Sequence, residues 1–296
     1  MALDSMAEIL EKIQRTGKPF WEIVLDTDVE EREVTPEASF EKMRMTWRAM
    51  LETDAAYRGE VHSVSGLVGG DGARMRAYAA ENRTVCGPLM AEVIATALCT
   101  GESNACMRRI VAAPTAGACG VLPAVLIPVQ RRDDLAEDEI VRALYVAAGI
   151  GAVIGYQACI AGASGGCQAE IGSASAMAAG ALTALRGGSA EQICDAVAMA
   201  LKNLLGLICD PVAGLVEVPC VKRNVVGAVN AVSCADMALA GVTSRVPVDQ
   251  VIVCMGDVGR RLPVEFRETA QGGLAATPFG EKIKEEMRSA RPDSVE

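Results

Sequence analysis

The sequence has 296 residues, of which 51% are hydrophobic and 22% are charged, so it can bury a large core in one domain and is not a disordered chain. A net charge of -10 and a pI near 4.9 argue against nucleic acid or an anionic membrane as a partner, because clustered Lys and Arg hold both. Only 3% of residues are aromatic, whereas Ala, Gly, Val and Met are abundant. This composition favours an all-α fold whose helices pack through small side chains.

The first 60 residues are expected to form a helical lead-in. Thr35 followed by Pro36 is typical of a helix start. The N-terminal stretch carries acids within its apolar run and no small-residue cleavage site, so we do not interpret it as a secretory signal and expect a cytoplasmic protein. Apolar residues recur at helical spacing at Leu3, Met6, Leu10 and Ile13.

Residues 61–280 are expected to form a single large helical domain, followed by a charged tail, 281–296, that forms a surface helix. The stretch 86–113 predicts one or two helices interrupted around Gly101. Strand signals are sparse, and the best candidate, VDQVIVCM, is also compatible with a helix. Gly- and Pro-rich loops separate the apolar runs: SGLVGGDG (65–72), APTAGACG (113–120), GASGGCQAEIG (162–172), CDPVAGLVEVPC (209–220) and RETAQGGLAATPFG (267–280).

The uncharged stretch 143–163 is long enough to resemble a membrane span. However, it contains several glycines and Gln157, and it has neither a basic flank nor an aromatic belt. We therefore interpret it as a buried central helix and expect no membrane partner.

The eleven cysteines are an odd number in a chain without an export signal, which indicates reduced thiols rather than a disulfide framework. Cys167 and Cys220 each precede an apolar helical run, where a helix N-terminus would lower the thiol pKa. Cys209 is expected at the end of a helix that Asp210-Pro211 stops. Other cysteines fall within apolar helical patterns and are expected in the core: Cys99, Cys194, Cys234 and Cys254.

Cysteines at three helix boundaries raise the question of a metal. Structural zinc sites usually have paired C-x2-C motifs and further ligands, but the chain has no C-x2-C motif and its only histidine is His62. Iron-sulfur clusters tolerate wider spacing, and a cubane with three cysteines leaves one iron open as a Lewis acid. The spacing alone does not decide between these alternatives.

Four motifs in order carry a family resemblance: APTAGACGVLPAVL, ASGGCQAEIGSASAMAA, CDPVAGLVEVPCVKRN and RETAQGGLAATPFG. Together they resemble the alpha subunit of the iron-sulfur-dependent bacterial L-serine dehydratases. The similarity runs from SGLVGGD to ATPFG, which is most of the chain.

The resemblance implies that 61–280 is a mostly α-helical catalytic domain that holds a [4Fe-4S] cluster through Cys167, Cys209 and Cys220. The fourth iron would bind the substrate. In such enzymes L-serine loses water to give aminoacrylate, which becomes pyruvate and ammonia without pyridoxal phosphate.

The loops of the matching motifs supply the remaining site residues. The substrate carboxylate is expected at two loops rich in backbone N–H groups and hydroxyls, with the candidates Ser65, Gly66, Thr115, Ala116 and Gly117. Residues expected to support the cluster without binding iron are Glu170, Asp210, Lys222 and Asn224. His62 is a candidate for the general base, although the family pattern does not require a histidine there.

The family also carries a smaller α/β portion with an S-H-T-x-G-P motif, which this sequence lacks. We therefore expect a separate beta subunit and a hetero-oligomer. Three alternatives stay open: a cysteine desulfhydrase or a threonine dehydratase on the same cluster, and a non-catalytic helical metal-binding subunit.

Overall fold

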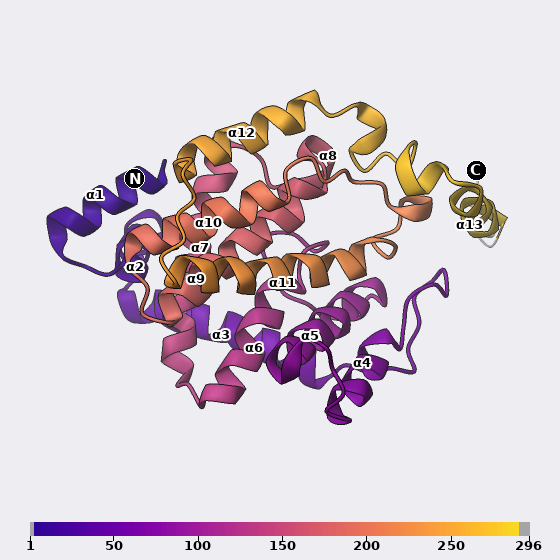
Figure 1. The fold of residues 1–296 in the computed structure, drawn as a ribbon, viewed down its shortest axis with the longest axis horizontal. Helices are drawn as coiled ribbons and strands as arrows, with labels where there is room; N and C mark the ends of the chain where they lie inside the picture. Colours follow the sequence, from indigo (N-terminus) through magenta and orange to yellow (C-terminus); the bar gives the residue numbers. More distant parts are fainter. Residues whose placement is uncertain (1–2, 290–296) are drawn as a thin grey trace.

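Helices make up the regular structure of residues 3–289, the part of the chain that the computed structural model describes (Figure 1). No strand forms in this range, where Cys209 and Arg267 make an isolated bridge, so the all-α prediction is confirmed. The α-helices are α1 (Met6–Thr16), α2 (Phe20–Arg32), α3 (Pro36–Ala55), α4 (Asp71–Ala80), α5 (Gly87–Ala105), α6 (Val121–Asp133), α7 (Glu137–Gln157), α8 (Gly162–Gly165), α9 (Ser173–Leu185), α10 (Ala190–Asn203), α11 (Cys220–Leu239), α12 (Val248–Arg261) and α13 (Pro278–Ser289). The shorter turns are η1 (Gln168–Gly172), η2 (Val212–Gly214), η3 (Val264–Phe266) and η4 (Gly273–Ala276).

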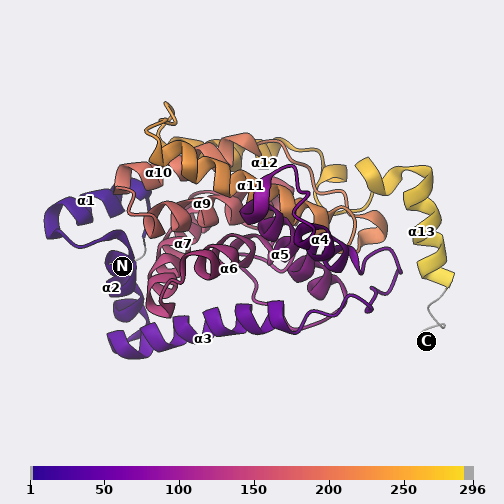
Figure 2. The ribbon, with the colours of Figure 1, turned by 60° about the horizontal axis from the view of Figure 1, so that its bottom comes forward.

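Helix α9 is the centre of the molecule, and every residue from Ser173 to Thr183 is buried. It packs against α6, α7, α10 and α11, which surround it in the views of Figures 1 and 2. Its sequence, SASAMAAGALTAL, is almost free of bulky side chains. Small residues let four neighbouring helices approach one central helix closely, as the composition indicated.

The outer helices extend the same core. Helices α2 and α3 pack on α7, α5 packs on α4, α6 and α11, and α12 packs on α10. The buried side chains of Phe20 and Trp47, from the lead-in, belong to the same apolar cluster as those of α9. Figure 2 shows α3 along one edge of the molecule and α13 at the end opposite α1.

The predicted interruption of α5 at Gly101 is wrong, because the helix runs unbroken from Gly87 to Ala105. Gly101 faces α11, where a Cβ atom would lie 3.3 Å from the Cα of Val221. The glycine therefore marks a close contact between two helices rather than a break in one of them.

The VDQVIVCM segment forms the start of α12 and not a strand. Its buried residues recur at intervals of three and four, which places them on one face of a helix. These residues are Val248, Val251, Ile252 and Met255.

Helix α7 is long and apolar enough to cross a membrane by length and composition, but 61% of its apolar window is buried inside the molecule. It packs against α2, α3, α9 and α12, as a core helix does. Helix α7 ends at Gln157, whereas the uncharged stretch from which a buried helix was predicted continues to residue 163.

The predicted helix start at Thr35 and Pro36 and the predicted surface helix after residue 280 both agree with the described residues. Pro36 is the first residue of α3, and the Thr35 hydroxyl accepts a hydrogen bond from the Ala38 N–H at 3.2 Å. The charged tail contributes most of α13, whose described side chains are largely exposed. The rest of the predicted tail, 290–296, lies outside the described residues.

Candidate active site

Cys167 comes from one segment of the chain, and Cys209 and Cys220 lie at the two ends of another, 209–220. All three are buried, with exposed fractions of 3%, 3% and 9%. Cys167 lies between α8 and η1, a turn of π-helix that continues into α9. Such turns within helices are frequent at functional sites. Cys220 is the first residue of α11, preceded by Pro219, as predicted.

The predicted position of Cys209 at a helix end is wrong. Helix α10 ends at Asn203, and Gly206, with φ +82°, takes the chain out of the helix before the cysteine. The Cys209 N–H donates to the carbonyl of Phe266 at 2.8 Å, and its carbonyl accepts from the Glu268 N–H at 2.9 Å. A distant part of the chain therefore fixes the backbone of this cysteine.

The thiols of Cys167 and Cys209 lie close enough for each to shift the pKa of the other. The Cys209 thiol lowers the pKa of Cys167 below its ordinary value, and the positive charge of Arg223 adds to the effect. The same contact and burial raise the pKa of Cys209. Cys167 is thus the thiol of this pair that ionises more readily.

Cys220 behaves differently from its prediction as a thiol acidified by a helix N-terminus. Burial raises its pKa to about 12, and the negative charge of Cys167 adds to the rise. The cost of removing a thiolate from water exceeds the stabilisation from the helix end. Burial and the charge of Cys167 therefore both favour the neutral thiol of Cys220.

The chemistry of the three cysteines is compatible with an iron-sulfur centre, whose ligands are thiolates. Within residues 3–289 no three His, Cys, Asp or Glu side chains lie close enough to hold one ion. In an iron-sulfur cluster each cysteine binds a different iron, so the ligands are further apart. All three cysteines are free thiols in the structure, as the composition predicted.

Arg223 is the positively charged residue that acts on the thiols of Cys167 and Cys220. Its Nη1 donates to the carbonyl of Ile208 at 2.9 Å, and its Nη2 donates to Oδ1 of Asp210 at 2.8 Å. The other carboxylate oxygen of Asp210 accepts from the Leu274 N–H at 2.8 Å. Asp210, which is 3% exposed, therefore joins the arginine to the segment that holds Cys209.

Asn224 connects the start of α11 to the 113–120 loop. Its Nδ2 donates to the carbonyls of Gly117 at 2.8 Å and Cys220 at 3.0 Å. Its Oδ1 accepts from the Gly120 N–H at 2.8 Å, and the side chain is 1% exposed. The asparagine thus sets the position of the predicted substrate loop relative to one of the three cysteines.

Glu170 lies between two loops that meet near the cysteines. A Cβ atom on Gly117 would lie 3.2 Å from its Oε1, and one on Gly162 would lie 2.8 Å from its Oε2 and 3.2 Å from Oε2 of Glu268. Burial raises the pKa of the Glu170 carboxyl, the nearby Thr115 hydroxyl opposes this rise, and the charge of Glu268 adds to it. The Thr115 Oγ1 is buried without a well-aligned hydrogen-bond partner in the described chain, so it can accept a ligand.

The other predicted loop residues have different surroundings. The Ser65 hydroxyl donates to Oε2 of Glu217, which also accepts from Ser63 at 2.7 Å. Gly66, with φ +75°, forms the tip of this turn. Ala116 is exposed, and its carbonyl accepts from Nδ2 of Asn104 at 3.1 Å.

His62, the candidate general base, and Lys222, expected to support the cluster, contact groups other than the three cysteine thiols. His62 is exposed, and its Nδ1 lies 3.1 Å from the carbonyl of Glu60. Lys222 is 75% exposed and pairs with Asp71 at 3.2 Å. Lys222 was expected to support the cluster, but the cation that acts on Cys167 is the adjacent Arg223.

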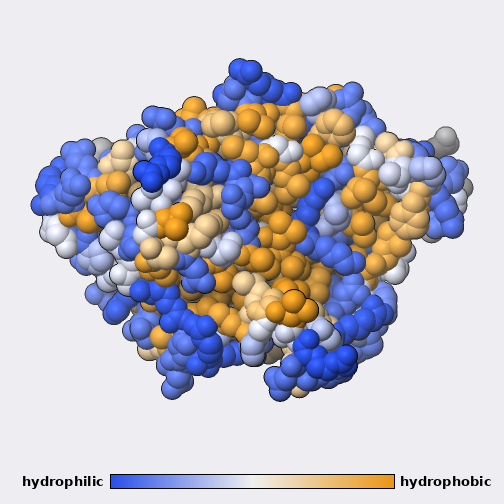
Figure 3. Space-filling model, in the orientation of Figure 1, coloured by the Kyte–Doolittle hydropathy of each residue, from blue (hydrophilic) through white to orange (hydrophobic). Residues whose placement is uncertain are grey.

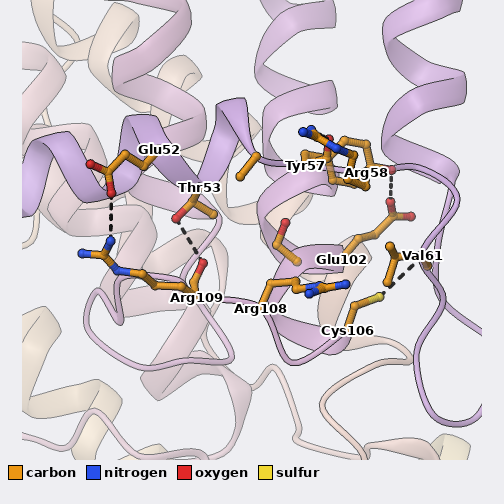
Figure 4. A pocket seen from close by; sticks show the side chains of 11 residues that line it. Glu52, Thr53, Tyr57, Arg58, Val61, Glu102, Cys106, Arg108 and Arg109 are labelled. Atoms are coloured by element: carbon orange, nitrogen blue, oxygen red, sulfur yellow. Dashed lines mark hydrogen bonds and ion pairs between the residues drawn. The ribbon is translucent and has the colours of Figure 1, made fainter.

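A cavity of about 380 Å³ lies between the end of α3 and the end of α5 (Figure 4). None of the three cysteines lines it. The carboxylate of Glu102 in its wall accepts from Asp71 N–H at 2.8 Å, Gly72 N–H at 3.2 Å and the Tyr57 hydroxyl at 2.5 Å. This buried acid, which the sequence interpretation missed, therefore holds the end of the 65–72 loop at the start of α4.

Comparison with known proteins agrees with the resemblance of the four motifs. The family model for the serine dehydratase alpha chain matches residues 15–275. The chain is 45% identical over 266 residues to the "Probable L-serine dehydratase, alpha chain" of Bacillus subtilis (strain 168), covering 90% of this chain and 89% of the relative. It is 39% identical over 287 residues to the "L-serine dehydratase, alpha chain" of Peptoniphilus asaccharolyticus, covering 96% and 98%.

Longer relatives match over part of their length. "L-serine dehydratase 1" of Escherichia coli (strain K12) is 45% identical over 181 residues, which is 60% of this chain and 40% of that protein. The matched region of the family model contains all three candidate cysteines and both candidate substrate loops. The chain belongs to the serine dehydratase alpha chain family.

Proposed function

We propose that the chain is the alpha subunit of a cytoplasmic L-serine dehydratase, a lyase that converts L-serine to pyruvate and ammonia. The observation that supports the proposal is that buried cysteines from two distant segments lie close enough to interact: Cys167 affects the pKa of both Cys209 and Cys220, and Arg223 acts on Cys167 and Cys220. The relatives that this chain matches over nearly their whole length carry the name L-serine dehydratase, alpha chain. Their names support the same activity here.

We propose further that Cys167, Cys209 and Cys220 hold a [4Fe-4S] cluster and that no pyridoxal phosphate is used. When bound by three cysteines, such a cluster supplies an iron without a protein ligand, a Lewis acid suited to a poor leaving group such as hydroxide. Arg223 offsets part of the negative charge that three thiolates bring into a buried site.

The surrounding residues have roles that follow from their contacts. The buried Thr115 hydroxyl, which has no well-aligned hydrogen bond, and the backbone at Gly117 are our candidates for binding the substrate carboxylate, and Asn224 holds that loop in position. Glu170 and Glu268 present two carboxylates next to Gly162, where they suit the substrate ammonium group. Fixing both ends of the amino acid orients its Cβ–O bond for cleavage.

We propose that a separate beta subunit completes the site and supplies a group for proton transfer. The relatives that match over most of their length are named as alpha chains, which supports an enzyme made of two different chains. The surface supports a partner as well: Val64, beside the substrate loop, is 75% exposed. Figure 3 shows apolar side chains gathered in the middle of the face that carries α10, α11 and α12. Extended apolar areas of this kind are typical of surfaces that bind another protein.

The test is anaerobic purification of the alpha chain, alone and with the beta chain, followed by an iron and sulfide count per chain. The 2-oxo acid product is then measured for each substrate: pyruvate from L-serine or L-cysteine, and 2-oxobutyrate from L-threonine. We expect a brown protein that forms pyruvate from L-serine only with the beta chain. A colourless chain without iron would contradict the cofactor, and full activity of the alpha chain alone would contradict the partner.

A further inference from the structure

Ser65 has an unexpected hydrogen-bond partner. A serine hydroxyl has a single donor hydrogen, and that of Ser65 is directed to Oε2 of Glu217. The Leu67 N–H donates to the same hydroxyl at 3.1 Å. Ser65 therefore has no hydrogen left to donate to a substrate carboxylate while it is bonded to Glu217.

Glu217 belongs to the cysteine segment, three residues before Cys220, and is 5% exposed. Its side chain accepts from both Ser63 and Ser65. Within residues 3–289 these two hydroxyls are the hydrogen-bond donors to this carboxylate. Because a buried carboxylate without donors is strongly destabilised, the turn that carries the serines must stay against the cysteine segment.

The turn itself is closed by its own hydrogen bonds. The Ser63 N–H donates to the Val68 carbonyl at 2.9 Å, and the Gly66 N–H donates to the Ser63 carbonyl at 3.0 Å. The Val68 N–H donates to the Ser63 hydroxyl at 3.3 Å. A turn closed in this way moves as one unit, so the hydrogen bonds to Glu217, together with the packing of Val68 on Leu98 and Val221, set its position.

We propose that Glu217 is a positioning residue that fixes the 63–68 turn of the substrate loop against the cysteine segment, and that Ser65 acts through Glu217 and not on the substrate. The inference rests on the proposed function, because it assigns this turn to the binding of L-serine. It connects the substrate loop to the segment that carries two of the three cysteines, Cys209 and Cys220.

The test uses the reconstituted complex of alpha and beta chains carrying Glu217→Gln, Ser65→Ala or both. Loss of a hydrogen bond to a buried charge should raise the KM for L-serine about tenfold in Glu217→Gln, with kcat and the iron count per chain unchanged. The double variant should be no worse than Glu217→Gln. Additive losses would show that Ser65 contacts the substrate, and loss of iron would show a role in cluster retention; either result would overturn the proposal.

Ser39→Ala is the matched control. Ser39 is 1% exposed, donates to Oδ2 of Asp28 at 2.5 Å and contacts the Tyr145 hydroxyl, so it forms a similar pair away from the cysteines. We expect this variant to lower the unfolding temperature and to leave the KM for L-serine unchanged. A rise in KM equal to that of Ser65→Ala would mean a general loss of stability and would also overturn the proposal.

Hydrogen exchange in the intact complex provides a readout that does not depend on turnover. In Glu217→Gln the amides of Leu67 and Val68, which are bonded to the serine hydroxyls, should exchange faster, while those of α9 should not. Unchanged exchange at these two amides would refute the attachment. Glu217→Asp keeps the negative charge, so it should accelerate exchange of the Leu67 and Val68 amides less than Glu217→Gln does. It replaces Glu217→Gln in the experiment if the glutamine variant does not fold. A wild-type complex that forms no pyruvate refutes the proposed function instead, while the exchange experiment still tests the attachment.

Discussion

Arg223 and Asp210 form a shielded ion pair, with 2.8 Å between Nη2 and Oδ1 and with side chains that are 15% and 3% exposed. The same guanidinium approaches Cys167, and the same carboxylate holds the Leu274 N–H. One pair thus joins the start of α11, the loop of Cys209 and the segment before α13.

Replacing Arg223 by Met should destabilise the chain and weaken retention of the cluster. The substitution leaves the Asp210 carboxylate buried without its cation, which costs on the order of 3 kcal/mol or more. Denaturant unfolding and iron per chain after gel filtration measure the two effects. Lys222→Met is the control, since Lys222 is 75% exposed, and an equal effect there would contradict the assignment.

Each of the three candidate ligands should be needed for iron binding. We expect Cys167→Ser, Cys209→Ser and Cys220→Ser to lose visible absorption and pyruvate formation. Cys234→Ala should keep both, because Cys234 is a core thiol of α11 whose pKa burial raises to about 11. A normal iron count in any of the three serine variants would remove that cysteine from the ligand set.

Asn224→Leu should impair substrate binding by releasing the 113–120 loop from Cys220. It removes the bonds to the Gly117 and Cys220 carbonyls, and we expect kcat/KM for L-serine to fall about tenfold or more. Asn230→Leu is a matched control on the same helix, because Asn230 donates to Ser175 and Ala200 instead. It should lower stability alone, and a similar fall in kcat/KM would contradict a role of Asn224 at the site.

The buried thiol of Cys119 predicts a loss of stability at alkaline pH. Burial raises its pKa to about 12 in the folded chain, from an ordinary value of 9.0. The folded state therefore keeps the proton longer, so the stability present below pH 9 is lost as the pH rises towards 12, by at most about 1.4 kcal/mol per pH unit. Cys119→Ala should make the fall in unfolding free energy between pH 8.5 and 10 less steep, and an unchanged slope would refute the prediction.

Much of the fold could be predicted because its signals are local. Small residues and helical spacing indicated an all-α protein, and Pro219 before a long apolar run indicated a helix starting at Cys220. VDQVIVCM stayed ambiguous because a short apolar run fits either structure until packing selects one face.

The remaining features depend on contacts between distant residues. Lys222 and Arg223 are adjacent, and only the packing of α11 decides that Arg223 faces Cys167. Glu217 is 154 residues from Ser63, so nothing near it in the sequence indicates its partner. Gly101 was interpreted as a break because its neighbour, Val221, lies on another helix.

The bridge between Cys209 and the 266–268 segment bears on the order of events during synthesis. The backbone of this cysteine is held by Phe266 and Glu268, and Asp210 beside it is held by Leu274. A nascent chain presents the N-terminal part first, so these anchors leave the ribosome late. The surroundings proposed for a prosthetic centre at Cys209 are therefore complete only after the 266–274 segment has been made and has packed against this cysteine.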